Sequence, residues 1–375
     1  MSERVVVRLG DVADVRWGDT STTKASYVPN GHVAYSASGP DGYLPHADYT
    51  AKGIVLSAIG AKCGQVWLAK GAWSCIKNTI RILEKDSDAC IEYLYWHLLL
   101  THPWPKRGSA QPFISQQDAR SVPISLPPLD EQRAVAQVLG ALDDKIAVND
   151  HLGGKYEALL RLYFADLRMD TEPSTSEVLV SELIELNPRT AISTGGDAAY
   201  LDMGALPTSS ARVTSWSRRP PKSGARFRNG DTVMARITPC LENGKVAFVD
   251  FLDDGEVGVG STEFIVLRAR PGVPTHLPYF LARSPRFRAH AIQNMSGSSG
   301  RQRVGANSLA PFPLSPPDAS RLERFGESAA AAFAHMKSLD TESRYLRELR
   351  DTLLPRLMSG EVRVREAEEL VEDAT

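Results

Sequence analysis

Clustered cationic and amide side chains are the chemically distinctive feature of this sequence. The segment SWSRRPPKSGARFR at residues 215–228 holds five arginine or lysine residues around Pro220-Pro221, and the prolines favour an extended loop. Arginine can donate two hydrogen bonds to a phosphate or to a guanine edge, and glutamine or asparagine can pair with adenine. The segment therefore predicts contacts to nucleic acid, and a solvated basic loop is the alternative interpretation.

Three further segments offer the same kinds of side chain. The loop SGSSGRQRVGAN at 296–307 adds small residues that allow close backbone approach, KRGSAQPF at 106–113 is comparable, and RWGDTSTTKASY lies at 16–27. Ser36 and Ser38 are additional candidates, whereas Trp17 is expected to pack. The residues predicted to contact nucleic acid are Arg16, Lys24, Lys62, Lys106, Arg107, Ser109, Gln111, Arg218, Arg219, Lys222, Arg226, Arg236, Arg301, Gln302, Arg303 and Asn307.

Signatures of catalysis are missing from the sequence. It contains no GxxxxGK[ST] loop for ATP hydrolysis and no NPPY or FxGxG element of the kind that amino-methyltransferases use. Asp143-Asp144-Lys145 could suggest a metal nuclease, but the three residues lie on a predicted helix, where facing solvent is the simpler interpretation. We therefore predict no catalytic residue, no metal site and no cofactor bound by this chain.

Bulk properties indicate a chain of the reducing cytoplasm. The four cysteines, Cys63, Cys75, Cys90 and Cys240, form no CxxC pair, and the eight histidines form no HExxH motif. No apolar run reaches the roughly 18 residues that a membrane span needs, and the N-terminus has no apolar signal core. A cytoplasmic protein without a membrane segment is expected.

The charge of the chain is sorted by region. The net formal charge is −2, yet residues 1–127 carry +2, 128–177 carry −5, 178–317 carry +5 and 318–375 carry −4. Two mildly basic regions thus alternate with two acidic ones, and such sorting creates local potentials that the net value conceals.

The same order of segments occurs twice along the chain. PISLPPLD at 123–130 aligns with PFPLSPPD at 311–318, and the loops GSAQPFIS at 108–115 and GSSGRQRV at 297–304 precede them. Farther upstream, GIVLSAIGAKCGQVWLA at 53–69 resembles GDTVMARITPCLENGKVAF at 230–248. This pattern predicts an internal duplication, in which each half is a compact α+β unit followed by a helix.

Each predicted helix is much longer than one such unit needs. Apolar residues recur at steps of three and four over roughly 40 residues after each proline pair, which corresponds to roughly 50–60 Å of helix. The two helices are therefore expected to cover each other. Gly153-Gly154 predicts either a kink or close approach of the partner helix. The residues predicted to pack between the helices are Leu142, Ile146, Tyr156, Tyr163, Phe325, Met336, Leu339, Leu346 and Leu353.

Two segments carry a resemblance to a known family. LPPLDEQRAVAQVLGALDDKIAVND at 126–150 resembles the helical region of the specificity subunits of type I restriction-modification enzymes, and LRELRDTLLPRLMSGEVRV at 346–364 resembles the end of that family. The second proline segment, SPPDAS at 315–320, departs from the LPPLxEQ pattern.

The resemblance implies a non-catalytic DNA-recognition subunit with several partners. Each globular unit would read one half of a split target in double-stranded DNA, and the helices would set the spacing. Two modification subunits would dock on the helices and methylate adenine with S-adenosylmethionine. Restriction subunits would add translocation and cleavage driven by ATP and Mg²⁺.

The predicted fold class is α+β, with two similar target-recognition domains separated by two long antiparallel helices that form a coiled coil with pseudo-two-fold symmetry. The predicted divisions are a first domain at 1–127, a helix and linker at 128–177, a second domain at 178–317, a second helix at 318–360 and an acidic tail at 361–375. Two alternatives stay open: a two-lobed nucleic-acid-binding or protein scaffold that is not tied to restriction, and a stand-alone nuclease or methyltransferase.

Overall fold

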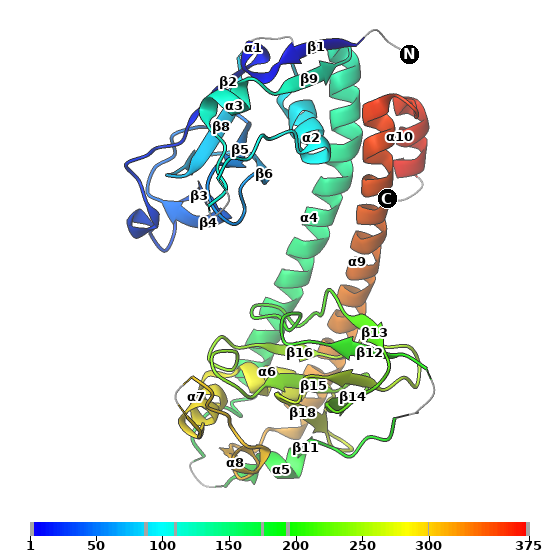
Figure 1. The fold of residues 1–375 in the computed structure, drawn as a ribbon. Helices are drawn as coiled ribbons and strands as arrows, with labels where there is room; N and C mark the ends of the chain where they lie inside the picture. Colours follow the sequence, from blue (N-terminus) through cyan, green and yellow to red (C-terminus); the bar gives the residue numbers. More distant parts are fainter. Residues whose placement is uncertain are drawn as a thin grey trace. The chain divides into compact units, whose positions relative to one another are not determined.

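The chain divides into two compact units. The computed structural model describes residues 4–85, 89–108, 111–173, 176–192, 196–298 and 300–372. The first unit comprises Met1–Ala147 with Glu342–Thr375, and the second comprises Val148–Thr341. The long helices α4 (Leu129–Asp166) and α9 (Ala319–Ser359) each contribute residues to both units (Figure 1).

Sheets and short helices make up the body of the first unit. Its strands are β1 (Val5–Arg8), β2 (Ala13–Trp17), β3 (His32–Ser36), β4 (Gly39–Leu44), β5 (Gly53–Ser57), β6 (Val66–Ala69), β7 (Trp73–Cys75), β8 (Thr79–Glu84) and β9 (Pro123–Leu126). Its helices, besides part of α4 and α9, are α1 (Leu9–Val12), a 3₁₀ turn at Lys24–Ser26, α2 (Ile91–Thr101), α3 (Gln116–Arg120) and α10 (Val364–Glu372). The sheet orders are β1-β9, β2-β8-β5-β6 and β4-β3-β7.

The second unit is built in the same way. Its strands are β10 (Val178–Leu179), β11 (Ile184–Leu186), β12 (Ala198–Leu201), β13 (Ser217–Arg219), β14 (Ala225–Phe227), β15 (Thr232–Ala235), β16 (Val246–Phe248), β17 (Gly258–Gly260), β18 (Phe264–Ala269) and β19 (Pro313–Leu314). Its shorter helices are α5 (Val180–Leu183), α6 (Leu277–Arg283), α7 (Pro285–Gln293) and α8 (Ala306–Leu309). The sheet orders are β10-β19, β11-β18-β15-β16 and β13-β12-β17-β14.

The strand pairings support the predicted duplication. The four-stranded sheet β2-β8-β5-β6 has the same order, in chain sequence, as β11-β18-β15-β16, and all its pairs are antiparallel in both units. Beside it, β3 pairs parallel with β7 and antiparallel with β4, as β12 does with β17 and β13. Strand β14 is an addition to the second unit. The α+β fold class with a repeated unit is therefore confirmed.

Alternate residues of the central strands enter two different cores. In β5, Ile54 and Leu56 join the core that contains the long helices, whereas Val55 joins a separate cluster around Trp73. In β15, Met234 faces the core with the long helices, and Val233 and Ala235 face a second cluster. Because successive side chains of a strand point to opposite faces, a sheet covered on both sides needs continuous apolar runs such as GIVL and TVMA.

Within each unit, α4 and α9 pack antiparallel. In the first unit, Leu142 and Ile146 share a core with Leu346 and Leu353, and Asp143 forms an ion pair with Arg350 at 2.6 Å. The triplet at 143–145 was expected to face solvent. This expectation is wrong for at least two members, because Asp143 and Lys145 bridge to α9, the latter through Glu342 at 3.2 Å.

In the second unit, α4 and α9 pack against the domain as well as against each other. Phe164 packs against Phe325 of α9 and Phe280 of α6, so the helices are covered by the domain as well as by each other. Of the nine residues predicted to pack, Leu142, Ile146, Phe325, Met336, Leu339, Leu346 and Leu353 are buried. Tyr156 is half-buried with its ring 5.2 Å from that of His335, and Tyr163, at 44% exposure, lies at the rim.

The LPPLDEQ motif fixes the beginning of α4. The buried Gln132 side chain donates to the Pro127 carbonyl oxygen at 2.9 Å and accepts from the Cys90 backbone N–H at 2.9 Å. It therefore joins the end of β9 to the N-terminus of α2. Glu131 forms an ion pair with Arg4 at 3.5 Å. Glu131 and Gln132 of the motif thus each bind a segment that lies outside α4.

Two expectations are corrected. The predicted acidic tail at 361–375 contains α10, whose Ala367 and Val371 are buried in the core of the first unit. Close approach of the partner helix at Gly153-Gly154 is not what the contacts show: Gly153 lies against Arg212 of the second unit's domain, and nothing lies within 4 Å of a Cβ built at Gly154. Both glycines lie inside one continuous helix. Among the described residues, no helix has the length and apolar character of a membrane span.

Candidate nucleic-acid interface

Both units carry a small closed loop at the position where the sequence predicts recognition residues. In the second unit, backbone bridges join Ser296 to Arg303 and Ile237 to Arg303, which closes the segment 296–303 next to the end of β15. In the first unit, bridges join Arg107 to Phe113 and Ile59 to Phe113, next to the end of β5. We call these segments loop 2 (296–303) and loop 1 (107–113). Their matching placement agrees with the alignment of the two halves.

Loop 1 is held by an ion pair to α3. The Arg107 guanidinium donates to the Asp118 carboxylate at 2.6 Å. Asp118 also belongs to the capping box of α3, in which its carboxylate accepts from the Ser115 hydroxyl and the Asp118 backbone N–H donates to that hydroxyl oxygen. Hydrogen bonds from Arg107 and Ser115 lower the pKa of Asp118.

The other predicted residues of this region are exposed. Lys106 and Gln111 are solvent-exposed, and the Lys106 side chain passes over Gly64, whose φ of +94° suits glycine. Ser109 lies outside the described residues.

Loop 2 contains the densest set of polar contacts. Arg303 forms a bidentate pair with Glu263, with distances of 2.7 to 2.9 Å, whereas Arg301, Gln302 and Asn307 are exposed. Hydrogen bonds from Arg303 are the main cause of the lowered pKa of Glu263.

The basic segment 215–228 is not a single extended loop. Strand β13 pairs with β12 at one edge of a sheet and β14 pairs with β17 at the other edge, so the segment crosses from edge to edge. Arg218 donates to Glu256 at 2.9 Å, and the Arg219 guanidinium lies 3.0 Å from the centre of the Tyr200 ring. Lys222 is exposed, with no partner found in the described ranges. The segment thus contains two short strands at the sheet edges, with Arg218, Arg219 and Arg226 exposed, and a sequence rich in arginine and proline gave no sign of this pairing.

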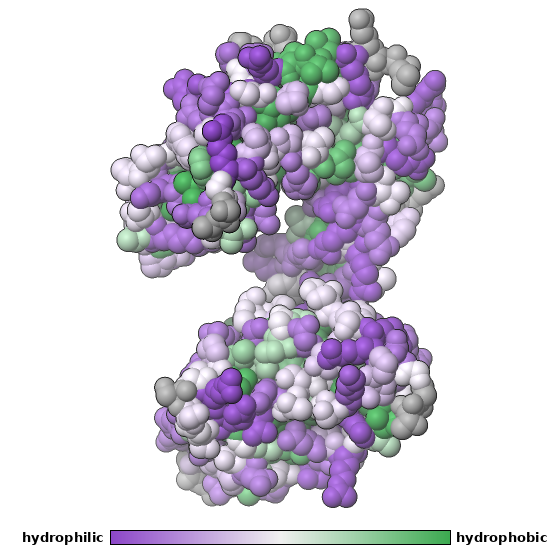
Figure 2. Space-filling model, in the orientation of Figure 1, coloured by the Kyte–Doolittle hydropathy of each residue, from purple (hydrophilic) through white to green (hydrophobic). Residues whose placement is uncertain are grey.

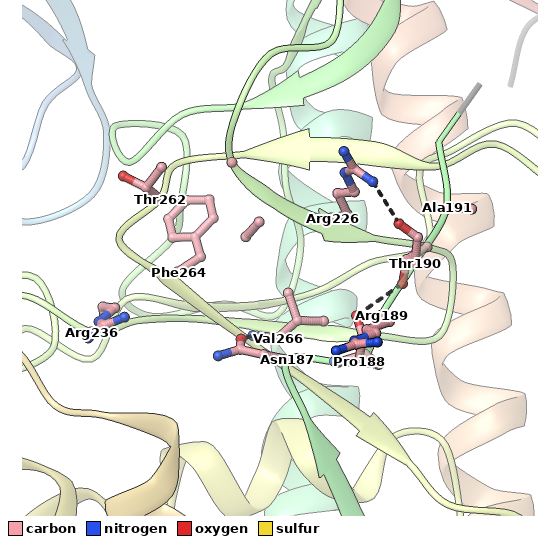
Figure 3. A pocket seen from close by; sticks show the side chains of 12 residues that line it. Asn187, Pro188, Arg189, Thr190, Ala191, Arg226, Arg236, Thr262, Phe264 and Val266 are labelled. Carbon is pink, nitrogen blue, oxygen red and sulfur yellow. Dashed lines mark hydrogen bonds between the residues drawn. The ribbon is translucent and has the colours of Figure 1, made fainter. Parts of the chain in front are cut away.

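Arg226 and Arg236 line one cavity of the second unit, shown in Figure 3. Its volume is about 750 Å³, and its walls include Arg189, Thr190 and Phe264 but no carboxylate among the described lining residues. Arg226 donates to the Thr190 carbonyl oxygen at 3.2 Å, whereas the buried Nε of Arg236 has no partner that the described residues supply. The cavity is therefore positively charged and suits an anionic group such as a phosphate.

In the first unit, Lys24 and Lys62 meet around Ser38. Lys24 forms an ion pair with Asp41 at 2.5 Å and Lys62 donates to the Ser38 carbonyl oxygen at 2.9 Å. The Ser36 hydroxyl donates to Asp41 at 2.8 Å. Burial raises the pKa of the Asp41 carboxyl, but hydrogen bonds from Lys24 and Ser36 outweigh burial and the net pKa is lowered. The structure thus brings together four residues that the sequence singled out in separate segments.

Arg16 and Trp17 lie apart from this cluster. Arg16 is exposed and pairs with Asp14 at 2.8 Å on β2, while Trp17 is half-buried against the core, as expected for packing. The carboxylates Asp14, Asp41, Asp118, Glu256 and Glu263 are the residues that sequence reasoning missed. Only Asp118 carried a readable signal, the Ser-x-x-Asp spacing of a capping box.

The side chains of the candidate interface are mainly polar and charged. Hydrophilic side chains are spread over the visible face of each unit, with smaller apolar patches between them (Figure 2). Within the described part of the chain, no group of three or more His, Cys, Asp or Glu side chains is placed to hold a metal ion. The arrangement can bind anions and pair with base edges.

Comparisons with known proteins show what this duplicated α+β protein resembles. Residues 1–153 match the model of the type I restriction modification DNA specificity domain. The specificity subunit of the type I restriction enzyme EcoEI from Escherichia coli is 28% identical over 238 residues, which cover 58% of this chain and 38% of that protein. The EcoAI specificity subunit, also from Escherichia coli, is 31% identical over 146 residues, covering 36% and 24%.

A solved structure extends the likeness to the whole fold. The crystal structure of the type I restriction-modification S subunit from M. genitalium matches 95% of this chain and 96% of its own, with a TM-score of 0.61 at 14% identity. Residues 1–153 are therefore similar to the type I restriction modification DNA specificity domain, and the fold of the whole chain is similar to that of a type I S subunit. Its matched stretches span less than two fifths of the length of either curated relative.

Proposed function

We propose that this chain is the DNA-specificity subunit of a type I restriction-modification complex. The observation that carries the proposal is the duplication of a recognition surface. Two units of the same strand order each present a closed loop beside the end of the equivalent strand, with the exposed Gln111 in one and the exposed Arg301 and Gln302 in the other. Arginine and glutamine are the side chains that read guanine and adenine edges.

Each unit reads one half of a bipartite target in double-stranded DNA. The loops differ in sequence, so the two half-sites differ as well. Cations without a carboxylate partner, such as Lys222 and Arg226, contact phosphates and fix the position of the unit on the duplex.

The long helices have a different task in this proposal. They set the spacing between the half-sites and dock two modification subunits, which methylate adenine with S-adenosylmethionine. Restriction subunits, with ATP and Mg²⁺, complete the assembly. The chain itself supplies no catalytic group, and its compartment is the cytoplasm, where DNA and free thiols such as Cys63 and Cys75 coexist.

A domain exchange tests the proposal. Residues 178–310 are replaced by the matching region of a relative with another specificity, which keeps α4 and α9 intact, and methylated bases are mapped in cells that carry the complete system. One half of the methylated motif should change while the other half and the spacer stay the same.

The reciprocal exchange of residues 1–122 is the matched control and should change the opposite half. A motif that shifts as a whole, or that keeps both halves, contradicts the assignment of one unit to one half-site. Methylation that does not depend on this chain at all would favour the scaffold that is not tied to restriction.

A further inference from the structure

The Glu263–Arg303 pair uses the whole hydrogen-bonding edge of the arginine. Nε of Arg303 donates to both Glu263 carboxylate oxygens at 2.9 and 2.8 Å, and Nη2 donates to Oε1 at 2.7 Å. The remaining nitrogen, Nη1, donates to the Arg301 carbonyl oxygen at 3.1 Å. Three of the five guanidinium N–H donors therefore have protein partners, and a side-on bidentate approach to guanine through Nε and Nη2 would require the bonds to Glu263 to break.

These contacts fix the backbone of loop 2. The Ser296 and Arg303 backbones exchange two hydrogen bonds of 2.9 Å, and the Val304 N–H donates to the Arg236 carbonyl oxygen at 2.9 Å. The Thr238 N–H donates to the Gln302 carbonyl oxygen at 3.1 Å. Glu263 immediately precedes β18, and its carbonyl oxygen accepts from the Arg236 backbone N–H at 3.0 Å. The Glu263–Arg303 pair, which we call the brace of loop 2, therefore has one end on the central sheet.

The two residues before Arg303 are in a different situation. The side chains of Arg301 and Gln302 are exposed, and the described residues provide no hydrogen-bond partner for either. Their backbone carbonyls are both held, by Arg303 Nη1 and by the Thr238 N–H. When the backbone of a loop is already fixed, less conformational entropy is lost as its polar side chains bind a ligand.

We infer that Arg303 is a positioning residue, and that the Glu263–Arg303 pair holds loop 2 so that Arg301 and Gln302 read the second half-site. This inference rests on the proposed function and corrects the sequence-based prediction that Arg303 itself contacts bases. The guanidinium of Arg301 suits guanine and the amide of Gln302 suits adenine.

The first unit supports the idea that these loops need a brace. Arg107 occupies the first position of loop 1 and pairs with Asp118 of α3, whereas Arg303 occupies the last position of loop 2 and pairs with the residue before β18. The two pairs occupy different positions of the repeated topology. Each nevertheless ties its loop to a regular element of the same unit.

The first test measures the loop without DNA. In the full-length chain, hydrogen exchange is followed at the backbone amides of Thr238, Ser296 and Arg303, which donate within the braced loop. Glu263→Gln and Arg303→Gln should accelerate exchange at these amides to the same extent, by about tenfold or more. Arg301→Ala and Gln302→Ala, which leave the brace intact, are the controls and should have no effect. Unchanged exchange in Glu263→Gln overturns the inference.

The second test measures specificity. The chain, assembled with its modification subunits, binds duplexes that carry the mapped target or a single base-pair change in the second half-site. Glu263→Gln and Arg303→Gln should each reduce discrimination by about tenfold at matched salt, and the double variant should lose no more than either single variant. Arg301→Ala and Gln302→Ala should each relax one base position.

Two results would overturn the inference. If Arg303→Gln relaxes one base position while Glu263→Gln behaves like the wild type, Arg303 reads that base directly. If the losses from the two substitutions add, the residues do not act as a pair. If the wild-type chain shows no preference for duplexes with a bipartite target, the proposed function is contradicted. The hydrogen-exchange rates alone then test whether the Glu263–Arg303 pair holds loop 2.

Discussion

The guanidinium of Arg212 lies against the backbone of Gly153 in α4. A Cβ at Gly153 would lie 3.2 Å from Nη1 of Arg212, closer than side chains normally approach. Arg212 also forms ion pairs with Asp340 of α9 at 2.5 Å and with Asp150 of α4 at 3.6 Å. One arginine from the domain thus joins both long helices of the second unit, and Gly153 leaves the space for it.

Alanine substitutions at the two neighbouring glycines should therefore differ. Gly154→Ala meets nothing within 4 Å and should stabilise the second unit by up to about 1 kcal/mol, the helix-propensity difference between the two residues. Gly153→Ala gains the same propensity, but its Cβ crowds the Arg212 guanidinium, which should weaken the ion pair of Arg212 with Asp340. Chemical denaturation of the two variants should show Gly153→Ala as the less stable, and equal stabilities would contradict this role of Arg212.

Glu157 of α4 anchors the helix to the domain of the second unit. Its carboxylate is 4% exposed and accepts from the Tyr279 hydroxyl at 2.6 Å, the Ala211 N–H at 3.0 Å and Arg161 at 2.6 Å. Glu157→Ala leaves two buried donors without an acceptor, which should lower the free energy of unfolding by about 3 kcal/mol. Lys155→Ala, at an exposed position of the same helix, is the control and should have little effect.

The buried His276 and the half-buried Asp250 of the second unit should respond to acid in opposite ways. Burial lowers the pKa of His276 from 6.5 to about 4, and burial raises the pKa of Asp250 from 3.8 to about 6. Between pH 6.5 and 4 the unfolded chain binds a proton at His276 that the folded chain does not, so stability falls as pH falls, by on the order of 3 kcal/mol. Between pH 6 and 3.8 the folded chain binds a proton at Asp250 that the unfolded chain does not. The contribution of Asp250 to stability therefore rises as pH falls.

Substitutions should separate the two contributions. Asp250→Asn should lose more stability than the wild type when the pH is lowered from 7 to 4.5, and His276→Gln should lose less. The measurement is denaturant unfolding at both pH values, compared as the change within each variant, so that a constant effect of the substitution cancels. Differences from the wild type that have the same sign in the two variants would show that these groups do not control the pH dependence.

Much of the fold could be predicted because its signals are local and repeated. The apolar runs GIVL and TVMA, the proline pairs and the three- and four-residue steps each report on one element. Their recurrence in one order predicted the duplication that the sheets β2-β8-β5-β6 and β11-β18-β15-β16 display. Helix α10 was missed because nine residues rich in glutamate resemble a tail until Ala367 and Val371 find a core.

The candidate site was predicted less completely because its contacts join distant segments. Glu263 and Arg303 are 40 residues apart, and Arg218 and Glu256 are 38 apart, so no local spacing marks them as pairs. The sequence singled out loops that occupy equivalent places in the two units, and the cations that lie in them. It did not distinguish an arginine whose charge is already paired, such as Arg303, from an exposed one such as Arg301.

Charge inside the helix pair of the first unit should disrupt it. Leu346 and Leu353 of α9 are 0% and 1% exposed, and they share a core with Leu142 and Ile146 of α4. Replacing both leucines by aspartate should cost several kcal/mol, because each charge would enter an apolar core. Tyr345→Asp on the same helix, at 54% exposure, is the matched control. The double variant should unfold at a lower temperature and should no longer support methylation of the target. The control should keep both properties.

The basic segment of the second unit should contribute to the salt dependence of DNA binding. For the chain assembled with its modification subunits, log Kobs should fall linearly with log salt, with a slope of about −0.9 per phosphate neutralised. Replacing Arg218, Arg219 and Lys222 together by alanine should flatten that slope. The structure adds an order among them: Lys222→Ala should have the largest single effect, because Arg218 is paired with Glu256 and Arg219 lies on Tyr200. Lys155→Ala, on the acidic α4, should leave the slope unchanged.

Two outcomes would contradict this prediction. An unaltered slope in the triple variant would remove the segment 217–222 from the DNA interface. A larger effect of Arg218→Ala than of Lys222→Ala would show that DNA displaces Glu256 from Arg218.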